Sequence, residues 1–173
     1  NTNIYKFELQ WSPDSKKILW NDQKFRLQYI DIDTKKITLV NTSDIDVIYS
    51  FEWSPDSKWI TYSQDEENGL KTIYLYSTET KVKTPITDGW YYSSQPTFSK
   101  DGKYLIFSSS RSFNPIYNHT EWNTAYIDMS KIYLVILSKD TKSPFAPVND
   151  EVKISKTENK DSKVKKDKSK KVS

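Results

Sequence analysis

The sequence is poor in the residues on which most enzyme and metal sites depend. It has no cysteine and a single histidine, His119, in 173 residues. Without cysteine, disulfides and thiolate metal sites are excluded, although this absence does not distinguish one cellular compartment from another. A serine hydrolase would need a histidine base and an activated nucleophile, and the sequence has no Gly-x-Ser-x-Gly pattern. We therefore predict no catalytic residue, metal ligand or cofactor site in this chain.

Long apolar runs and a signal peptide are missing as well. No apolar stretch approaches the roughly 18 residues of a membrane-spanning helix, so we expect no membrane insertion. The chain starts at Asn1 and enters a strand-like segment almost at once, which we interpret as an excerpt or processed product of a longer protein. Acidic pairs such as Asp31 with Asp33 lack the glycine and remaining ligands of a calcium loop, so we interpret them as turn residues.

Charge is distributed unevenly along the chain. The net charge is +3, but residues 153–173 hold nine lysines against three acidic residues, and no aromatic residue. Such a segment cannot bury enough apolar surface to fold, so residues 151–173 are predicted to form a disordered lysine-rich linker. The preceding part of the chain is mildly acidic and offers no basic surface, so we expect no nucleic-acid partner.

A repeated pattern dominates the rest of the chain. Trp11, Trp53 and Phe98 each precede Ser-Pro-Asp-Ser-Lys or its variant Ser-Lys-Asp-Gly-Lys, at spacings of 42 and 45 residues. Serine, proline and aspartate suit the first three corners of a type I turn, and Gly102 takes the last corner of the third copy. A period of about 40–45 residues with four short strands is typical of β-propeller blades.

The predicted fold is an all-β partial propeller of three antiparallel blades, at about 5–46, 47–92 and 93–150. The expected strands are 5–11, 17–21, 26–31 and 37–41, then 47–53, 59–64, 71–77 and 82–87, then 95–99, 104–109 and 132–137. Pro144 and Pro147 interrupt the place of a fourth strand in the third blade, because proline cannot donate to a ladder. An open ring leaves two blade faces uncovered, so we expect self-association through them.

The third blade carries an insertion, residues 110–131, that is rich in aromatic residues. Loops this long are usually functional or disordered. In an up-and-down blade, the loop between its second and third strands emerges on the same face as the loop between blades. One rim is therefore predicted to carry aromatic residues beside an acidic group formed by Asp44, Asp46 and residues 65–67. Its candidate binding residues are Trp90, Tyr91, Tyr92, Arg111, Trp122 and Tyr126. The alternative is that the insertion packs over its own blade.

The Ser-Pro-Asp-Ser-Lys repeat resembles the WD-like propeller repeats of TolB and of prolyl-oligopeptidase-type and tricorn-type proteases. The third blade is more specific. Residues 101–109, the insertion with residues 127–130, and residues 132–137 followed by 143–145 resemble the end of the first propeller of tricorn-type peptidases. In that family a charged low-complexity segment precedes the second propeller, and the lysine-rich linker is similar to it.

The resemblance implies a non-catalytic propeller segment of a large serine peptidase that degrades oligopeptides. The segment would gate or channel peptides to a catalytic domain absent from this chain. Its expected partners are oligopeptides or other domains of the same protein, and its expected location is the periplasm or the outside of the cell, with the cytoplasm left open. The alternatives are a TolB-like periplasmic protein-interaction propeller and, on the aromatic rim alone, a carbohydrate-binding propeller.

Overall fold

The computed structural model describes residues 3–113, 115–118 and 123–147, and every regular element within them is a β-strand. The chain divides into two units, residues 1–143 and 144–173, and the architecture below belongs to the first. The lysine-rich linker lies outside the described residues, so its disorder and the domain boundary at residue 150 stay predictions.

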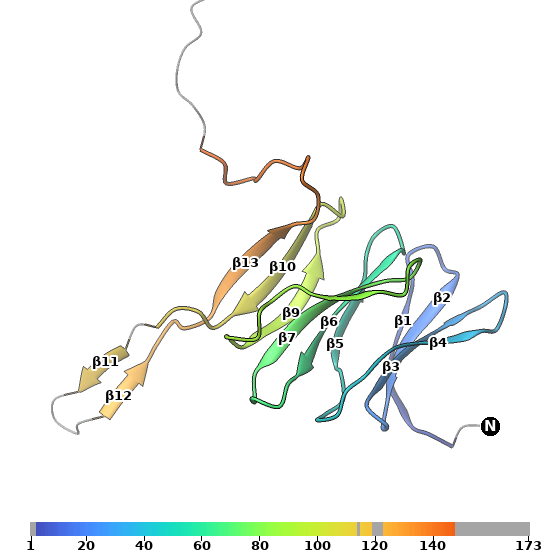
Figure 1. The fold of residues 1–173 in the computed structure, drawn as a ribbon, viewed down its shortest axis with the longest axis horizontal. Helices are drawn as coiled ribbons and strands as arrows, with labels where there is room; N and C mark the ends of the chain where they lie inside the picture. Colours follow the sequence, from blue (N-terminus) through green and yellow to red (C-terminus); the bar gives the residue numbers. More distant parts are fainter. Residues whose placement is uncertain (1–2, 114, 119–122, 148–173) are drawn as a thin grey trace, which may run out of the picture. The chain divides into compact units, whose positions relative to one another are not determined.

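The first two blades are four-stranded antiparallel sheets in which each strand pairs with the next one along the chain (Figure 1). Blade one consists of β1 (Lys6–Trp11), β2 (Lys17–Asp22), β3 (Arg26–Asp31) and β4 (Ile37–Thr42). Blade two consists of β5 (Ser50–Trp53), β6 (Trp59–Asp65), β7 (Lys71–Ser77) and β8 (Lys83–Pro85). All eight predicted strands are present, although β5 and β8 are shorter than the sequence suggested.

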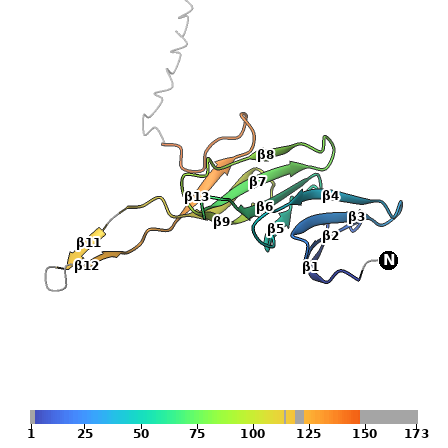
Figure 2. The same ribbon diagram turned by 60° about the horizontal axis from the view of Figure 1, so that its bottom comes forward.

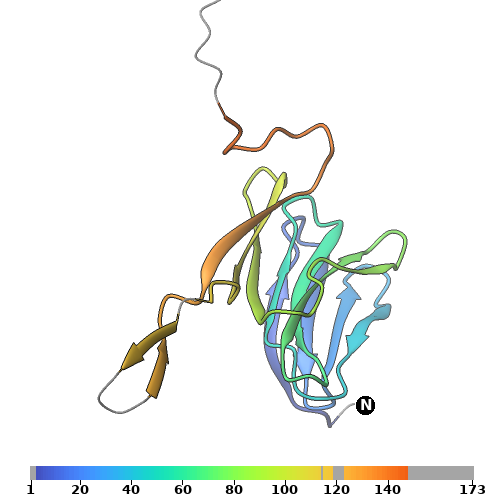
Figure 3. The same cartoon turned by 60° about the vertical axis from the view of Figure 1, so that its left-hand side comes forward.

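Within the described residues the sheet of the third blade has three strands, as the prolines suggest. Its sheet order is β13 (Lys131–Ile136), β10 (Tyr104–Ser109) and β9 (Ser93–Phe98). The insertion between β10 and β13, for which the sequence predicts a loop, contains a two-stranded hairpin of β11 (Pro115–Asn118) and β12 (Asn123–Tyr126). Figure 2 shows the three blade sheets side by side, and Figure 3 shows the hairpin standing apart from them.

The repeated turn joins the first two strands of every blade by the same hydrogen bonds. The Ser12 hydroxyl donates to Asp14 Oδ1 (2.6 Å) and accepts from the Lys17 N–H (2.9 Å). The last corner is in the left-handed region, with φ of 58° at Ser15, 61° at Ser57 and 68° at Gly102. The same hydroxyl bonds recur at Ser54 with Asp56 and Trp59, and at Ser99 with Asp101 and Tyr104. A local motif therefore fixes the reversal of the chain in each blade.

The apolar core lies between blades, at two interfaces that we name the first boundary (blades one and two) and the second boundary (blades two and three). Buried residues of the first boundary include Leu19, Tyr29, Trp53 and Ile60. The buried cluster of the second boundary is smaller and is formed by Ile73, Leu105 and Phe107. Each blade is therefore held mainly by its neighbour, as expected for propeller blades.

An edge strand of blade one, β1, and an edge strand of blade three, β13, expose large apolar side chains. Leu9 and Trp11 are exposed on β1, and Ile132 and Ile136 are exposed on β13. These side chains lie on the blades that have a neighbour on only one side in this chain. Self-association through them stays a prediction.

Candidate functional site

Three consecutive aromatic residues lie exposed on the loop that joins blade two to blade three. The side chains of Trp90, Tyr91 and Tyr92 are 78%, 44% and 40% exposed. Gly89, directly before Trp90, has a φ of +75°, and a Cβ atom on it would lie 3.3 Å from Thr72 Oγ1. Because both the conformation and the space favour glycine, this turn places the three aromatic residues at the rim of the blades.

Arg111, at the start of the insertion, is held against this loop by aromatic rings. Its guanidinium carbon lies 5.6 Å from the ring centroid of Tyr91 and 4.9 Å from that of Tyr133, and it lies 5.8 Å from Phe107. Its Nε–H donates to Ser109 Oγ (3.0 Å), and the Ser110 N–H donates to the Tyr92 carbonyl (2.9 Å). The structure thus brings Tyr91, Tyr92 and Arg111 together; with Trp90 they form what we call the aromatic rim.

The remaining predicted site residues are not joined to the aromatic rim. The ring of Tyr126 packs on that of Phe113, with centroids 5.2 Å apart, and both side chains are exposed. Among the contacts of the described residues, none connects Tyr126 to Trp90, Tyr91 or Tyr92. Trp122 and His119 lie outside the described residues.

An acidic hollow of about 350 Å³ lies close to the aromatic rim. It is lined by Asp44, Ile45 and residues 64–68, which include Asp65, Glu66 and Glu67. Asn68 links the two regions, because its Nδ2 donates to the carbonyl of Gly89 (3.1 Å). The prediction from blade geometry that Asp44 and residues 65–67 share one face agrees with this arrangement, whereas Asp46 does not line the hollow.

Two neighbours fix the acidic side chains of this hollow. Lys71 Nζ lies 2.7 Å from Asp65 Oδ2, and the Tyr74 hydroxyl donates to Glu66 Oε1 (2.8 Å). Burial, and then this hydrogen bond to Glu66, raise the pKa of Tyr74 to about 12, so its hydroxyl stays protonated at neutral pH. Within the part of the chain that the structure describes, no group of three His, Cys, Asp or Glu side chains is arranged to hold a metal ion. Nor does that part contain a helix able to cross a membrane.

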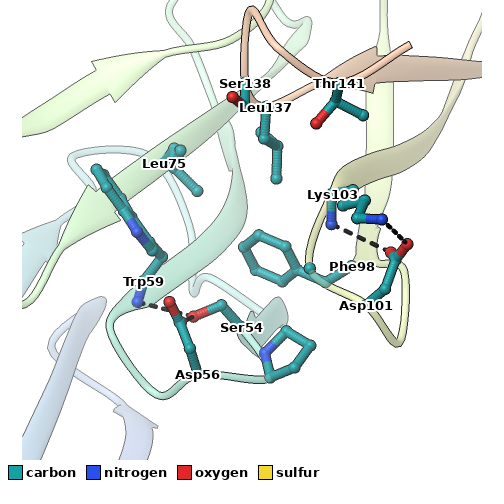
Figure 4. Close-up of a pocket in the computed structure, with 12 residues that line it drawn as sticks. Ser54, Asp56, Trp59, Leu75, Phe98, Asp101, Lys103, Leu137, Ser138 and Thr141 are labelled. Carbon is teal, nitrogen blue, oxygen red and sulfur yellow. Dashed lines mark hydrogen bonds and ion pairs between the residues drawn. The ribbon is translucent and has the colours of Figure 1, made fainter. Parts of the chain in front are cut away.

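A second concave feature, which sequence reasoning missed, lies at the second boundary beside the blade turns. This inter-blade groove, of about 350 Å³, has apolar walls from Trp59, Leu75, Phe98 and Leu137 (Figure 4). Asp56 and Asp101 of the two adjoining turns also line it. The repeat alignment held a signal for it, because Leu75 and Phe98 occupy the positions that Tyr29 and Trp53 fill at the first boundary.

The whole chain, residues 1–173, matches the family model of the tricorn protease second β-propeller domain. A tricorn protease homolog of Saccharolobus solfataricus is 34% identical over 140 residues, which are 81% of this chain and 13% of that protein. The crystal structure of the tricorn protease matches with a TM-score of 0.74 at 23% identity, over 80% of this chain and 14% of that one. TolB from Acinetobacter baumannii matches with a TM-score of 0.51 at 19% identity, over 73% of this chain and 33% of that one.

These matches confirm the predicted propeller fold and the resemblance to tricorn-type peptidases. They differ on one point, since the sequence resemblance pointed to the end of the first propeller and the matching family model describes the second. The chain spans about an eighth of the length of the Saccharolobus relative. The likeness to TolB shows a shared fold alone. This chain belongs to the family of tricorn protease second β-propeller domains.

Proposed function

We propose that this chain is a non-catalytic propeller segment of a tricorn-like peptidase, and that it gates or channels peptides to a catalytic domain elsewhere in the parent protein. The observation that carries this proposal is the aromatic rim, where Trp90, Tyr91 and Tyr92 are exposed side by side and Arg111 fixes Tyr91. Such side chains offer large contact areas and few rotamers to lose, so they bind extended peptides at a low entropic cost.

The acidic hollow next to the aromatic rim adds a preference for charge. Asp44 and Glu67 line it together with Asp65 and Glu66. A peptide that lies across the rim would bring its α-amino group or a basic side chain towards these carboxylates. The attraction between opposite charges would then favour binding. The rim and hollow together thus suit the amino-terminal part of an unfolded peptide.

The test is peptide turnover by the parent peptidase with Trp90→Ala and Tyr91→Ala combined. We expect kcat/KM for a ten-residue peptide to fall about tenfold, because two contact residues that carry binding energy are lost. A blocked dipeptide substrate is too short to contact the rim while it is being cleaved, so its kcat/KM should stay unchanged. Val82→Ser is the matched control, since Val82 is 54% exposed on another part of blade two.

Equal losses for both substrates would show a general defect rather than a role in peptide access. No loss for either substrate would remove the rim from peptide handling and favour a propeller that binds a protein partner, as the TolB-like alternative expects.

A further inference from the structure

We infer that the inter-blade groove binds an aromatic side chain that neighbours a basic residue in an extended peptide. Successive antiparallel strands alternate in direction, so the blade turns that border this groove lie at the opposite end of the blades from the aromatic rim. The inferred site is thus separate from the rim, and it does not depend on the function proposed above.

The first boundary shows what the corresponding place holds when it is filled. There the rings of Tyr29 and Trp53 pack edge to face, with centroids 5.7 Å apart. At the second boundary the repeat places Leu75 and Phe98 at these two positions. Both replacements are smaller, and Phe98 has no indole N–H to match the one that Trp53 directs at the Gln10 carbonyl (3.4 Å). The missing ring volume is the physical origin of the groove.

The blade turn enlarges the groove in the same way. At the first boundary, Ser57 Oγ accepts the Asp14 N–H (3.0 Å), which ties one blade turn to the next. Gly102 stands at the position of Ser57 in the third blade. A Cβ atom on it would lie 3.9 Å from Pro55 Cδ, an ordinary van der Waals contact. The turn of blade three therefore leaves open a place that a side chain could occupy without a clash.

A cation completes the filled arrangement at the first boundary. Lys81 Nζ lies over the Tyr29 ring, 5.1 Å from its centroid, and donates to the Tyr29 hydroxyl and to the Thr78 carbonyl. An ammonium group over a ring is attracted by the negative face of the π-system. The molecule itself thus shows that an aromatic ring with an adjacent cation fits this place between two blades.

The charges around the inter-blade groove favour the same chemistry. Asp56 Oδ1 accepts from the Ser54 hydroxyl and the Lys58 N–H, while Oδ2 has no hydrogen-bond partner among the described residues. The hydrogen bond from Ser99 lowers the pKa of Asp101, so this carboxylate is ionised at neutral pH. Lys103 Nζ lies 3.7 Å from Asp101 Oδ2 and balances one of the two charges. Lys58 is also near Asp56, but its ammonium forms its ion pair with Glu79 (2.9 Å), so Asp56 has no ion pair among the described residues. The remaining negative charge is complementary to a lysine or arginine of the bound peptide.

The apolar wall supplies the binding surface for the ring. Trp59 is 38% exposed, and the equivalent position in blade one is Lys17, which pairs with Asp14 instead (3.7 Å). A peptide ring would lie against Trp59, Leu75 and Phe98. Burying such a ring contributes enough free energy to change affinity about tenfold or more.

The experiment is an NMR titration of the full chain, following the indole N–H resonance of Trp59. The probe is a blocked hexapeptide with Phe-Lys at its centre and alanine elsewhere. We expect a saturable shift of this resonance, with at least about tenfold weaker binding when alanine replaces the phenylalanine. Replacing the lysine by glutamate should weaken binding several-fold, because the peptide would then bring a negative charge to Asp56.

Two protein variants make the test specific. Leu75→Tyr combined with Phe98→Trp gives the second boundary the two aromatic residues of the first. The added rings should fill the groove, so binding should weaken at least tenfold while the melting temperature stays equal or rises. Asp56→Asn changes an exposed residue, so it should fold normally and weaken binding several-fold. Val82→Ser is the control, and it should leave the titration of the Trp59 resonance as in the unchanged chain, because Val82 is exposed and lines neither the groove nor the aromatic rim.

The inference is overturned if the Trp59 resonance does not shift with about 10 mM peptide, or if the filled groove binds equally well. It is also overturned if the resonance responds to protein concentration and not to peptide, because a second copy of the chain would then occupy the groove.

Discussion

The two blade boundaries are built from the same repeat, yet the first is filled and the second is hollow. At the first boundary, Tyr29 packs on Trp53 and Ser57 hydrogen-bonds the preceding turn. At the second boundary, the equivalent residues Leu75 and Phe98 line a groove. The comparison teaches that the repeat motif fixes turns and strands, while the size of a few side chains decides whether adjoining blades close against each other.

The largest expected difference between the boundaries concerns the aromatic residue just before the blade turn, which is Trp53 at the first boundary and Phe98 at the second. Trp53→Ala should lower the free energy of unfolding by about 3–5 kcal/mol, since it removes a ring that is 3% exposed and densely packed. Phe98→Ala should cost distinctly less, because one side of that ring already faces the groove. Urea unfolding of both variants measures the difference. Equal losses would mean that the second boundary is as tightly packed as the first.

The second comparison uses the serine that closes each blade turn. Ser12→Ala should cost about 1–2 kcal/mol at pH 7, because the buried Ser12 hydroxyl donates to Asp14 and accepts from the Lys17 N–H. Ser99→Ala removes the same bonds from a more exposed turn and should cost less. Melting both variants beside the unchanged chain at pH 7 checks the order, and equal losses would mean that the exposure of the turn is unimportant.

The cost of Ser12→Ala should also depend on pH. The hydrogen bond from Ser12 lowers the pKa of Asp14 below its ordinary value of 3.8. A carboxyl group whose folded pKa is lowered stabilises the fold above its unfolded pKa, and this stabilisation is lost as the pH falls through the folded pKa. The difference between variant and unchanged chain should therefore shrink below about pH 4. A difference that stays constant down to pH 2 would contradict the assignment.

A smaller effect is expected from the residue at the last corner of the turn. Ser57→Ala keeps the strained left-handed backbone and loses the bond to the Asp14 N–H, at a cost of about 1 kcal/mol. Gly102→Ser offers the second boundary a hydroxyl at the equivalent place but introduces a side chain at a φ of 68°. These opposing terms should leave its melting temperature nearly unchanged. A large loss in Gly102→Ser would show that the third turn cannot accept the geometry of the second.

The smallest expected effect is that of the lysine over the Tyr29 ring. Lys81→Met keeps most of the apolar stem and removes the ammonium group, so we expect a loss of about 0.5–1 kcal/mol. Lys142 is the counterpart of Lys81 in the repeat, but Leu75 replaces the ring there. The turn also differs, because the Thr141 N–H donates to the Ser138 carbonyl, whereas in blade two it is the Lys81 N–H that donates to the carbonyl of Ser77. Lys142→Met should therefore change nothing measurable. Equal effects in thermal melts would remove the cation from the distinction between the boundaries.

Much of this fold could be predicted from the sequence because its signals are local. The Ser-Pro-Asp turn and the strands after it depend on neighbouring residues, so their repeated spacing predicts all eleven strands of the three blades, ten of them to within two residues at each end. The two prolines likewise predict that blade three lacks a fourth strand, and none is present among the described residues. The grouping of Tyr91 and Tyr92 with Arg111 followed from the up-and-down order of strands.

What the sequence could not give depends on contacts between distant segments. The hairpin of β11 and β12 has short strands without a clear alternation, and the sequence between them, residues 119–122, contains no Asn-Gly or Asp-Gly pair of the kind that marks tight hairpins. The groove arises because Leu75 and Phe98, from different blades, are both smaller than their counterparts. Neither residue is unusual in its own strand. The repeat alignment shows each smaller side chain by itself, but it does not show that the two line the same groove.

The three-stranded third blade also sets how the amide protons of this chain exchange with solvent. In its sheet, β10 lies between β9 and β13, so its amides bond to strands on both sides, whereas β13 has a strand partner on one side only among the described residues. Every second N–H of β13 therefore points to the open edge, and those protons should exchange far faster than the protons of β10. Hydrogen exchange measured for each strand would thus show whether the third blade opens from β13, which would lose protection before β10 and β9.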